Sequence, residues 1–159
     1  MSHEGEVNAD LFFAHDSPRE SQREMISDGI EALKCGGFLL AAAPTGIGKT
    51  AAALASSIAV AKLYSTSPET PKILFLTGRQ SQHRIVVDTI REINKRLPPG
   101  FSKLKLVDII GRKSMCKNVD AVGKCQCEEG VTESERRFLR SDLGAYIHSE
   151  PMHVDQVLK

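Results

Sequence analysis

The stretch that decides the fold is Ala43-Pro44-Thr45-Gly46-Ile47-Gly48-Lys49-Thr50. It matches the phosphate-binding pattern G-x-x-x-x-G-K-[ST], with Ala in the place of the first Gly. In such a loop the backbone N–H groups surround an anion, glycines permit its close approach, and the following helix adds partial positive charge. The stretch therefore predicts a nucleotide site, with contacts from Thr45, Gly46, Ile47, Gly48, Lys49 and Thr50.

Two residues of this loop carry predicted catalytic roles. The Lys49 ammonium would stabilise charge on the β- and γ-phosphates of ATP, and the Thr50 hydroxyl would ligate Mg²⁺. The alternative is a Gly-rich connection between a strand and a helix, without a ligand. The apolar run at residues 38–42 and the Ala-rich segment after Lys49 favour the nucleotide site. The absence of Gly-x-Gly-x-x-Gly disfavours a nicotinamide cofactor.

Apolar runs and helical patterns alternate on both sides of the loop. The predicted helices cover residues 17–34, 49–64 and 82–97, and the predicted strands cover residues 38–42, 72–77 and 104–110. Short, continuous apolar runs are typical of strands buried on both faces of a parallel sheet. This order predicts an α/β fold with a doubly wound parallel sheet.

Composition narrows the class of protein. The chain has 159 residues, a formal net charge of +1 and 41% hydrophobic residues, which is ordinary for a globular protein. No run approaches the roughly 18 apolar residues of a membrane span, and the polar start does not resemble a secretory signal. We expect no membrane partner, and a reducing compartment, either the cytoplasm or the nucleus.

Residues 91–113 form a basic stretch, which predicts contact with a nucleic-acid backbone or, alternatively, a solvated surface. Its charged residues are Arg91, Lys95, Arg96, Lys103, Lys105, Arg112 and Lys113, against Glu92 and Asp108.

After residue 110 the strand pattern ends and cysteines appear. Cys116, Cys125 and Cys127 have the spacing Cys-x8-Cys-x-Cys, which predicts a metal site, and nearby cations would offset the charge of bound thiolates. The alternatives are a zinc site completed by His148 or His153, or three free thiols. The fourth cysteine, Cys35, is predicted to be a buried or half-buried structural thiol. A capping box at Thr132-Glu133-Ser134-Glu135 predicts a helix to about residue 143, and residues 153–159 are expected to form the first turns of another helix.

The order of four motifs resembles a known family. Residues 43–50 have the form of motif I in superfamily-two helicases, and Pro18-Arg19-Glu20-Ser21-Gln22 resembles the adenine-reading Gln motif. Residues 76–83 resemble motif Ia, and residues 111–116 resemble the start of an inserted iron–sulfur domain. Together they resemble the XPD family of iron–sulfur DNA helicases, with the bacterial DinG helicases as cousins.

This resemblance implies a partial RecA-like P-loop NTPase lobe at residues 1–110 and a partial, mostly helical iron–sulfur domain at residues 111–159. It implies ATP-driven 5′–3′ movement on single-stranded DNA in DNA repair, with partners from a repair or transcription-repair complex. The implied cofactors are ATP, Mg²⁺ and a [4Fe–4S] cluster, held by Cys116, Cys125, Cys127 and a fourth ligand outside this chain. Adenine contacts are expected from Arg19 and Gln22, and DNA contacts from Arg79, Ser81, Gln82 and His83.

The chain also departs from the family. Gly78-Arg79-Gln80 replaces the usual Arg-Thr-His of motif Ia, and the acidic Asp-Glu-x-His box and the second motor lobe are missing. We interpret the chain as an N-terminal fragment that binds nucleotide weakly and hydrolyses it negligibly. The alternative is a self-contained P-loop switch or kinase-like module.

Overall fold

The computed structural model describes residues 8–65, 71–115, 120–122 and 132–157. The chain divides into two compact units, Met1–Lys103 and Leu104–Lys159. The division falls slightly before residue 110, where the sequence predicts the end of the first domain.

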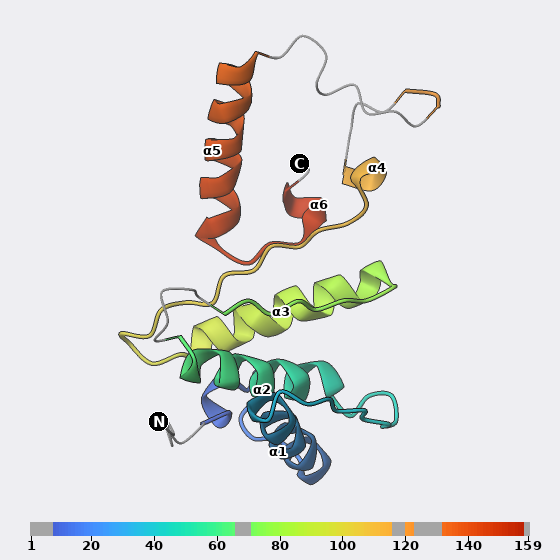
Figure 1. The fold of residues 1–159 in the computed structure, drawn as a ribbon, viewed down its shortest axis with the longest axis vertical. Coiled ribbons are helices and arrows are strands. Elements are labelled where there is room, and N and C mark those ends of the chain that lie inside the picture. The colour runs from blue at the N-terminus through green and yellow to red at the C-terminus, as the bar shows by residue number, and fades with distance from the viewer. Residues whose placement is uncertain (1–7, 66–70, 116–119, 123–131, 158–159) are drawn as a thin grey trace. The chain divides into compact units, whose positions relative to one another are not determined.

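The first unit is a small helical assembly centred on α2. It contains the short 3₁₀ helix η1 (Asp10–Phe12), α1 (Glu20–Lys34), α2 (Lys49–Leu63) and α3 (Gln80–Arg96). Helix α2 lies alongside α1 and also contacts η1 and α3 (Figure 1). Most of its alanines are buried, including Ala52 and Ala55, and small side chains allow neighbouring helices to come close. Val86, Ile90 and Ile93 of α3 are buried, so one stripe of that helix faces the core.

The second unit contains α4 (Arg112–Met115), α5 (Glu133–Ser149) and α6 (Val154–Val157). Its extended residues 104–110 meet the chain before α6 through one isolated parallel bridge between Val107 and Met152. The Val154 backbone N–H also donates to Asp108 Oδ2 at 2.9 Å, which satisfies one of the amides at the start of α6.

The predicted α/β fold with a parallel sheet, and with it the RecA-like lobe, is wrong for the described residues. They form helices and extended segments, and no strand or sheet is found among them. The segments predicted as strands are extended but have no ladder. The side chains of the first two segments are uncovered: Phe38 and Leu40 are 101% and 98% exposed, and Leu74 and Leu76 are 83% and 88% exposed. An apolar run favours an extended backbone, but a strand also needs a neighbour for its N–H and C=O groups.

The helix predictions hold because their signals are local. Helix α2 begins at Lys49 as predicted, and α3 begins two residues before the predicted start. Helix α5 begins after Thr132, whose hydroxyl and Glu135 form the predicted capping box, although the helix continues to Ser149. Helix α1 begins later than predicted, at Glu20, and its capping residue is Arg19.

The chain before α1 is part of the core. Ala9, Phe12, Phe13 and Ala14 are all buried, and η1 contacts both α2 and α3. None of the helices in the described ranges is long and apolar enough to cross a membrane.

Candidate nucleotide-binding site

The loop of residues 43–50 joins an extended segment to the first turn of α2. Gly46 and Gly48 have φ angles of +86° and +83°, which L side chains rarely adopt, so both positions need glycine. The backbone N–H groups of residues 45–48 make no hydrogen bond to any described residue. Together with the unpaired amides that begin every helix, they form a concentration of donors suited to an anion.

The Lys49 side chain already lies across this loop. Its Nζ atom donates to the carbonyl oxygens of Ala43 and Pro44, both at 2.7 Å. The ammonium therefore holds the beginning of the loop next to the helix that follows it. An ammonium has three N–H donors, so one more is available for a phosphate oxygen. Thr50 is the next residue of α2 and is half-buried.

The predicted adenine contacts come from the first turn of α1. Arg19 is exposed, whereas Gln22 is buried at 5% exposure. The Gln22 Oε1 atom accepts the Arg19 backbone N–H at 2.8 Å and so caps the helix. The Gln22 amide nitrogen lies directly against Gly48, so that a Cβ on Gly48 would overlap it. The structure thus brings Gln22 to the phosphate loop.

Sequence reasoning missed this contact between Gln22 and Gly48. The signal was the polar capping pattern, in which a Gln at the third helical position bonds back to the residue before the helix. A helix start at residue 17, as predicted, gives this role to Glu20 instead of Gln22.

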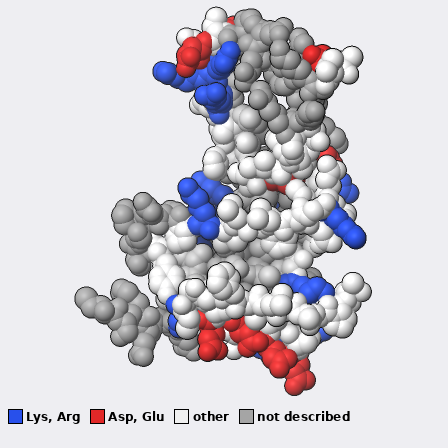
Figure 2. Space-filling model, turned by 45° about the vertical axis from the view of Figure 1, so that its right-hand side comes forward, with Lys and Arg blue, Asp and Glu red and all other residues white. Residues whose placement is uncertain are grey.

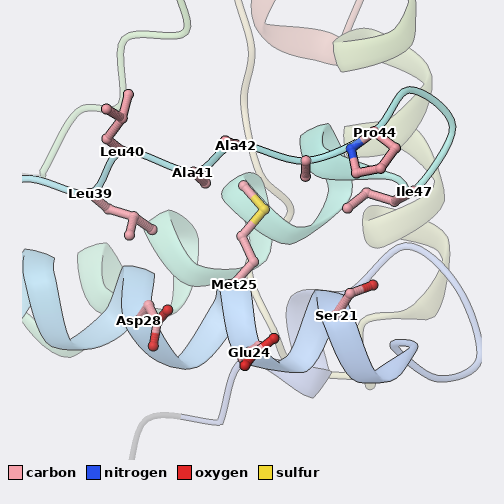
Figure 3. Close-up of a pocket in the computed structure, with 11 residues that line it drawn as sticks. Ser21, Glu24, Met25, Asp28, Leu39, Leu40, Ala41, Ala42, Pro44 and Ile47 are labelled. Atoms are coloured by element: carbon pink, nitrogen blue, oxygen red, sulfur yellow. The ribbon is translucent and has the colours of Figure 1, made fainter.

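A pocket of about 510 Å³ adjoins the loop on the side of α1. Figure 3 shows Met25 pointing from α1 toward the extended chain, with Pro44 and Ile47 of the loop above the same helix. Ser21, Glu24 and Asp28 supply the polar groups of its lining. The volume is within the range of small-molecule sites.

The exposed face of α1 is acidic. Red side chains gather along the lower edge of Figure 2, where α1 lies, and the exposed acids of this helix are Glu20, Glu24, Asp28 and Glu31. A row of carboxylates repels phosphates, so a nucleic-acid backbone would not bind along this face.

The predicted DNA contacts gather at the start of α3. Arg79 is the residue before the helix and is exposed, and its backbone N–H donates to Thr77 Oγ1 at 3.3 Å. Ser81 is exposed, while Gln82 and His83 are half-buried. The four residues therefore share one helix end, which offers backbone donors to an anion.

The basic stretch is less positive than its sequence indicates. Lys95 pairs with Glu92 at 2.6 Å, and Arg91 pairs with Asp88 at 3.6 Å. Arg96 reaches Asp16 at 2.8 Å and lowers the pKa of that carboxyl. These three cations of α3 thus have carboxylate partners. Two of the partners are in α3 itself, and the third, Asp16, is far from Arg96 in the sequence.

The predicted iron–sulfur ligands Cys116, Cys125 and Cys127 lie outside the described residues. The prediction for Cys35 is wrong: its thiol is exposed, because α1 ends at Lys34 and the chain turns into solvent at Gly36.

Of the alternative zinc ligands, His148 is exposed on α5. His153 is buried, with Nε2 3.7 Å from Asp108 Oδ2 and Nδ1 3.2 Å from Asp155 Oδ2. No group of three potential metal ligands is found among the described residues.

Comparisons of the chain with protein-family models, with curated proteins and with solved structures found no match.

Proposed function

We propose that this chain binds the triphosphate of Mg·ATP through residues 43–50. The observation that carries the proposal is the joint geometry of this loop: two glycines at positive φ, unbonded amides at residues 45–48, and the Lys49 ammonium lying on the loop. In this arrangement the amides bind phosphate oxygens, Lys49 neutralises their charge and Thr50 ligates Mg²⁺. The pocket beside Ile47 provides room for the nucleoside.

The test is a calorimetric titration of the folded protein with Mg·ATP and with Mg·tripolyphosphate. We expect both to bind, because the predicted contacts are to phosphate. Lys49→Ala should lower both affinities by about 10- to 100-fold, since a hydrogen bond to a charged group contributes about 1.5–3 kcal/mol. Lys62→Ala is the matched control, because Lys62 is an exposed lysine of the last turn of α2. Equal affinities for the Lys49→Ala variant and the unchanged protein would overturn the proposal.

We further propose that the chain is the nucleotide-binding part of an ATP-dependent 5′–3′ DNA helicase of the XPD type that acts in DNA repair. The support is the order of the four motifs along the chain and the gathering of Arg79, Ser81, Gln82 and His83 at one helix end. Single-stranded DNA is the proposed partner, and Cys116, Cys125 and Cys127 are the proposed ligands of a [4Fe–4S] cluster.

The DNA proposal is tested with a labelled oligothymidylate. Arg79→Ala should weaken binding and reduce the dependence of affinity on salt, because a contact between a cation and a phosphate releases counterions. Arg137→Ala, an exposed arginine of α5, is the control. A protein that binds Mg·ATP but shows no affinity for the oligonucleotide at low salt would contradict the DNA part alone.

A nucleotide-dependent switch is the second candidate. It is favoured by the docking of Lys49 on the carbonyls of Ala43 and Pro44, because a ligand that draws Lys49 away would change the loop. The absence of DNA binding together with tight Mg·ATP binding would favour this candidate.

A further inference from the structure

We infer that Gln22 is a positioning residue for the phosphate loop, acting through Gly48, rather than the group that reads the base. The inference rests on the proposed function of the loop and adds to it. Gln22 would hold the loop in the shape that binds phosphates, and the chain would recognise the phosphates of a nucleotide rather than its base through this residue.

The first observation is that the Gln22 amide is enclosed. Gln22 is 5% exposed although it belongs to the first turn of α1, where its neighbours Ser21 and Arg23 are exposed. Its burial is therefore specific to this position. A buried amide is expected to have partners for its polar atoms.

The second observation is that both ends of this amide lie against other parts of the chain. The oxygen accepts the Arg19 backbone N–H at 2.8 Å, and the nitrogen lies against the bare Cα of Gly48. Recognition of the N6 and N7 edge of adenine requires one donor and one acceptor from the same amide. The oxygen keeps a second lone pair, but the side chain is 5% exposed, with its oxygen in the helix cap and its nitrogen on Gly48, so the amide does not face outward to present both groups to a base.

The third observation is that α1 provides a fixed support for this contact. A Cβ built on Gly29 would lie 2.8 Å from Ser56 Oγ, so α1 and α2 come very close at a second point. Gln22 and Gly29 therefore hold α1 against α2 at two points, the residue before the helix and Ser56, about two turns further along. Gly48 is the residue before α2, and its φ of +83° orients the last amides of the loop. A shift of Gln22 would accordingly move the amides that receive the phosphates.

These observations predict a specific pattern of ligand affinities. Gln22→Ala should weaken Mg·ATP, Mg·GTP and Mg·tripolyphosphate by the same factor, about 3- to 10-fold, because all three depend on the loop. A residue that reads the base would instead change the ratio of ATP to GTP affinity and leave tripolyphosphate unaffected. Ser27→Ala, at an exposed position of the same helix, is the control.

A double-mutant cycle tests the contact without any ligand. Gly48→Ala should lower the melting temperature by less in the Gln22→Ala background than in the unchanged protein, because removal of the amide leaves room for the new Cβ. Additive effects in the cycle, or a loss of affinity confined to ATP, would overturn the inference. If the folded protein binds neither ATP nor tripolyphosphate, the proposed function fails, and the cycle still decides whether Gln22 positions Gly48.

Discussion

Single residues of the loop have distinct roles that follow from their chemistry. Gly46 and Gly48 permit the backbone angles, Lys49 bridges the loop to α2, and Thr50 places a hydroxyl at the first turn of the helix. The sequence predicted these roles because each follows from a residue type at a fixed spacing. It could not predict that Gln22 would lie against Gly48, since that contact depends on how two helices pack.

At this scale we predict that Thr50 determines how strongly ATP binding depends on Mg²⁺. Chelation of Mg²⁺ with EDTA should weaken ATP binding to the unchanged protein. In Thr50→Ala the same treatment should have a much smaller effect, because the metal has lost a protein ligand. Thr50→Ser keeps the hydroxyl and should behave like the unchanged protein. An EDTA effect of equal size in all three proteins, measured by calorimetry, would show that Thr50 does not hold the metal.

At the scale of elements, helices were predicted well and strands were not. The Ala-rich α2 and the apolar stripe of α3 carry their signals in their own residues. Segments 38–42 and 72–77 carry a signal for extended backbone, but their pairing depends on residues elsewhere in the chain. The exposure of Phe38 and Leu74 shows the consequence, because no described strand covers them.

Two helical glycines should respond in opposite ways to the same substitution. Gly29→Ala should destabilise the protein, because its Cβ would meet Ser56 Oγ at 2.8 Å and overpacking costs about 1–3 kcal/mol. Gly144→Ala in α5 meets nothing within 4 Å, and it should stabilise the helix by about 0.8–1.0 kcal/mol. Chemical denaturation measures both. Stabilisation by Gly29→Ala would show that α1 and α2 are not in close contact there.

The capping box of α5 should make this helix sensitive to acid. Hydrogen bonds from the Thr132 hydroxyl and backbone lower the pKa of Glu135 from its ordinary value of 4.5. Because the pKa of Glu135 is lower in the folded helix than in the unfolded chain, the ionised carboxylate stabilises the helix above pH 4.5. This stabilisation is lost as the pH falls through the pKa that Glu135 has in the folded helix. Helicity measured by circular dichroism should therefore decrease below about pH 4.5.

A matched variant isolates this effect. Glu135→Gln keeps an acceptor for the cap but does not titrate, so its helicity should decrease less over the same range. Thr132→Ala should lower helix stability by about 1 kcal/mol at neutral pH. An identical acid profile for Glu135→Gln and the unchanged protein would contradict the prediction.

At the scale of the whole molecule, the chain comprises two compact units with different proposed roles. The nucleotide loop belongs to Met1–Lys103, and the three clustered cysteines belong to Leu104–Lys159. The sequence indicated both roles from local motifs. It did not predict the helical fold of the first unit, because the burial of Phe12 and Phe13 and the contacts of η1 with α2 and α3 arise only in three dimensions.

The cysteine proposal predicts the metal content of protein purified without oxygen. Iron and sulfide should be present at less than one cluster per chain, because three thiolates hold a [4Fe–4S] cluster incompletely. Replacing Cys116, Cys125 or Cys127 with Ser should lower the iron content, whereas Cys35→Ser, in the other unit, should not. One zinc per chain without iron would contradict the cluster.

The most direct test of phosphate binding by residues 43–50 is amide NMR of the folded protein titrated with Mg·ATP. We predict saturable shifts that are largest for the N–H signals of residues 45–50 and absent in Lys49→Ala at the same concentration. Saturable shifts located elsewhere, or no shifts at millimolar Mg·ATP, would contradict it.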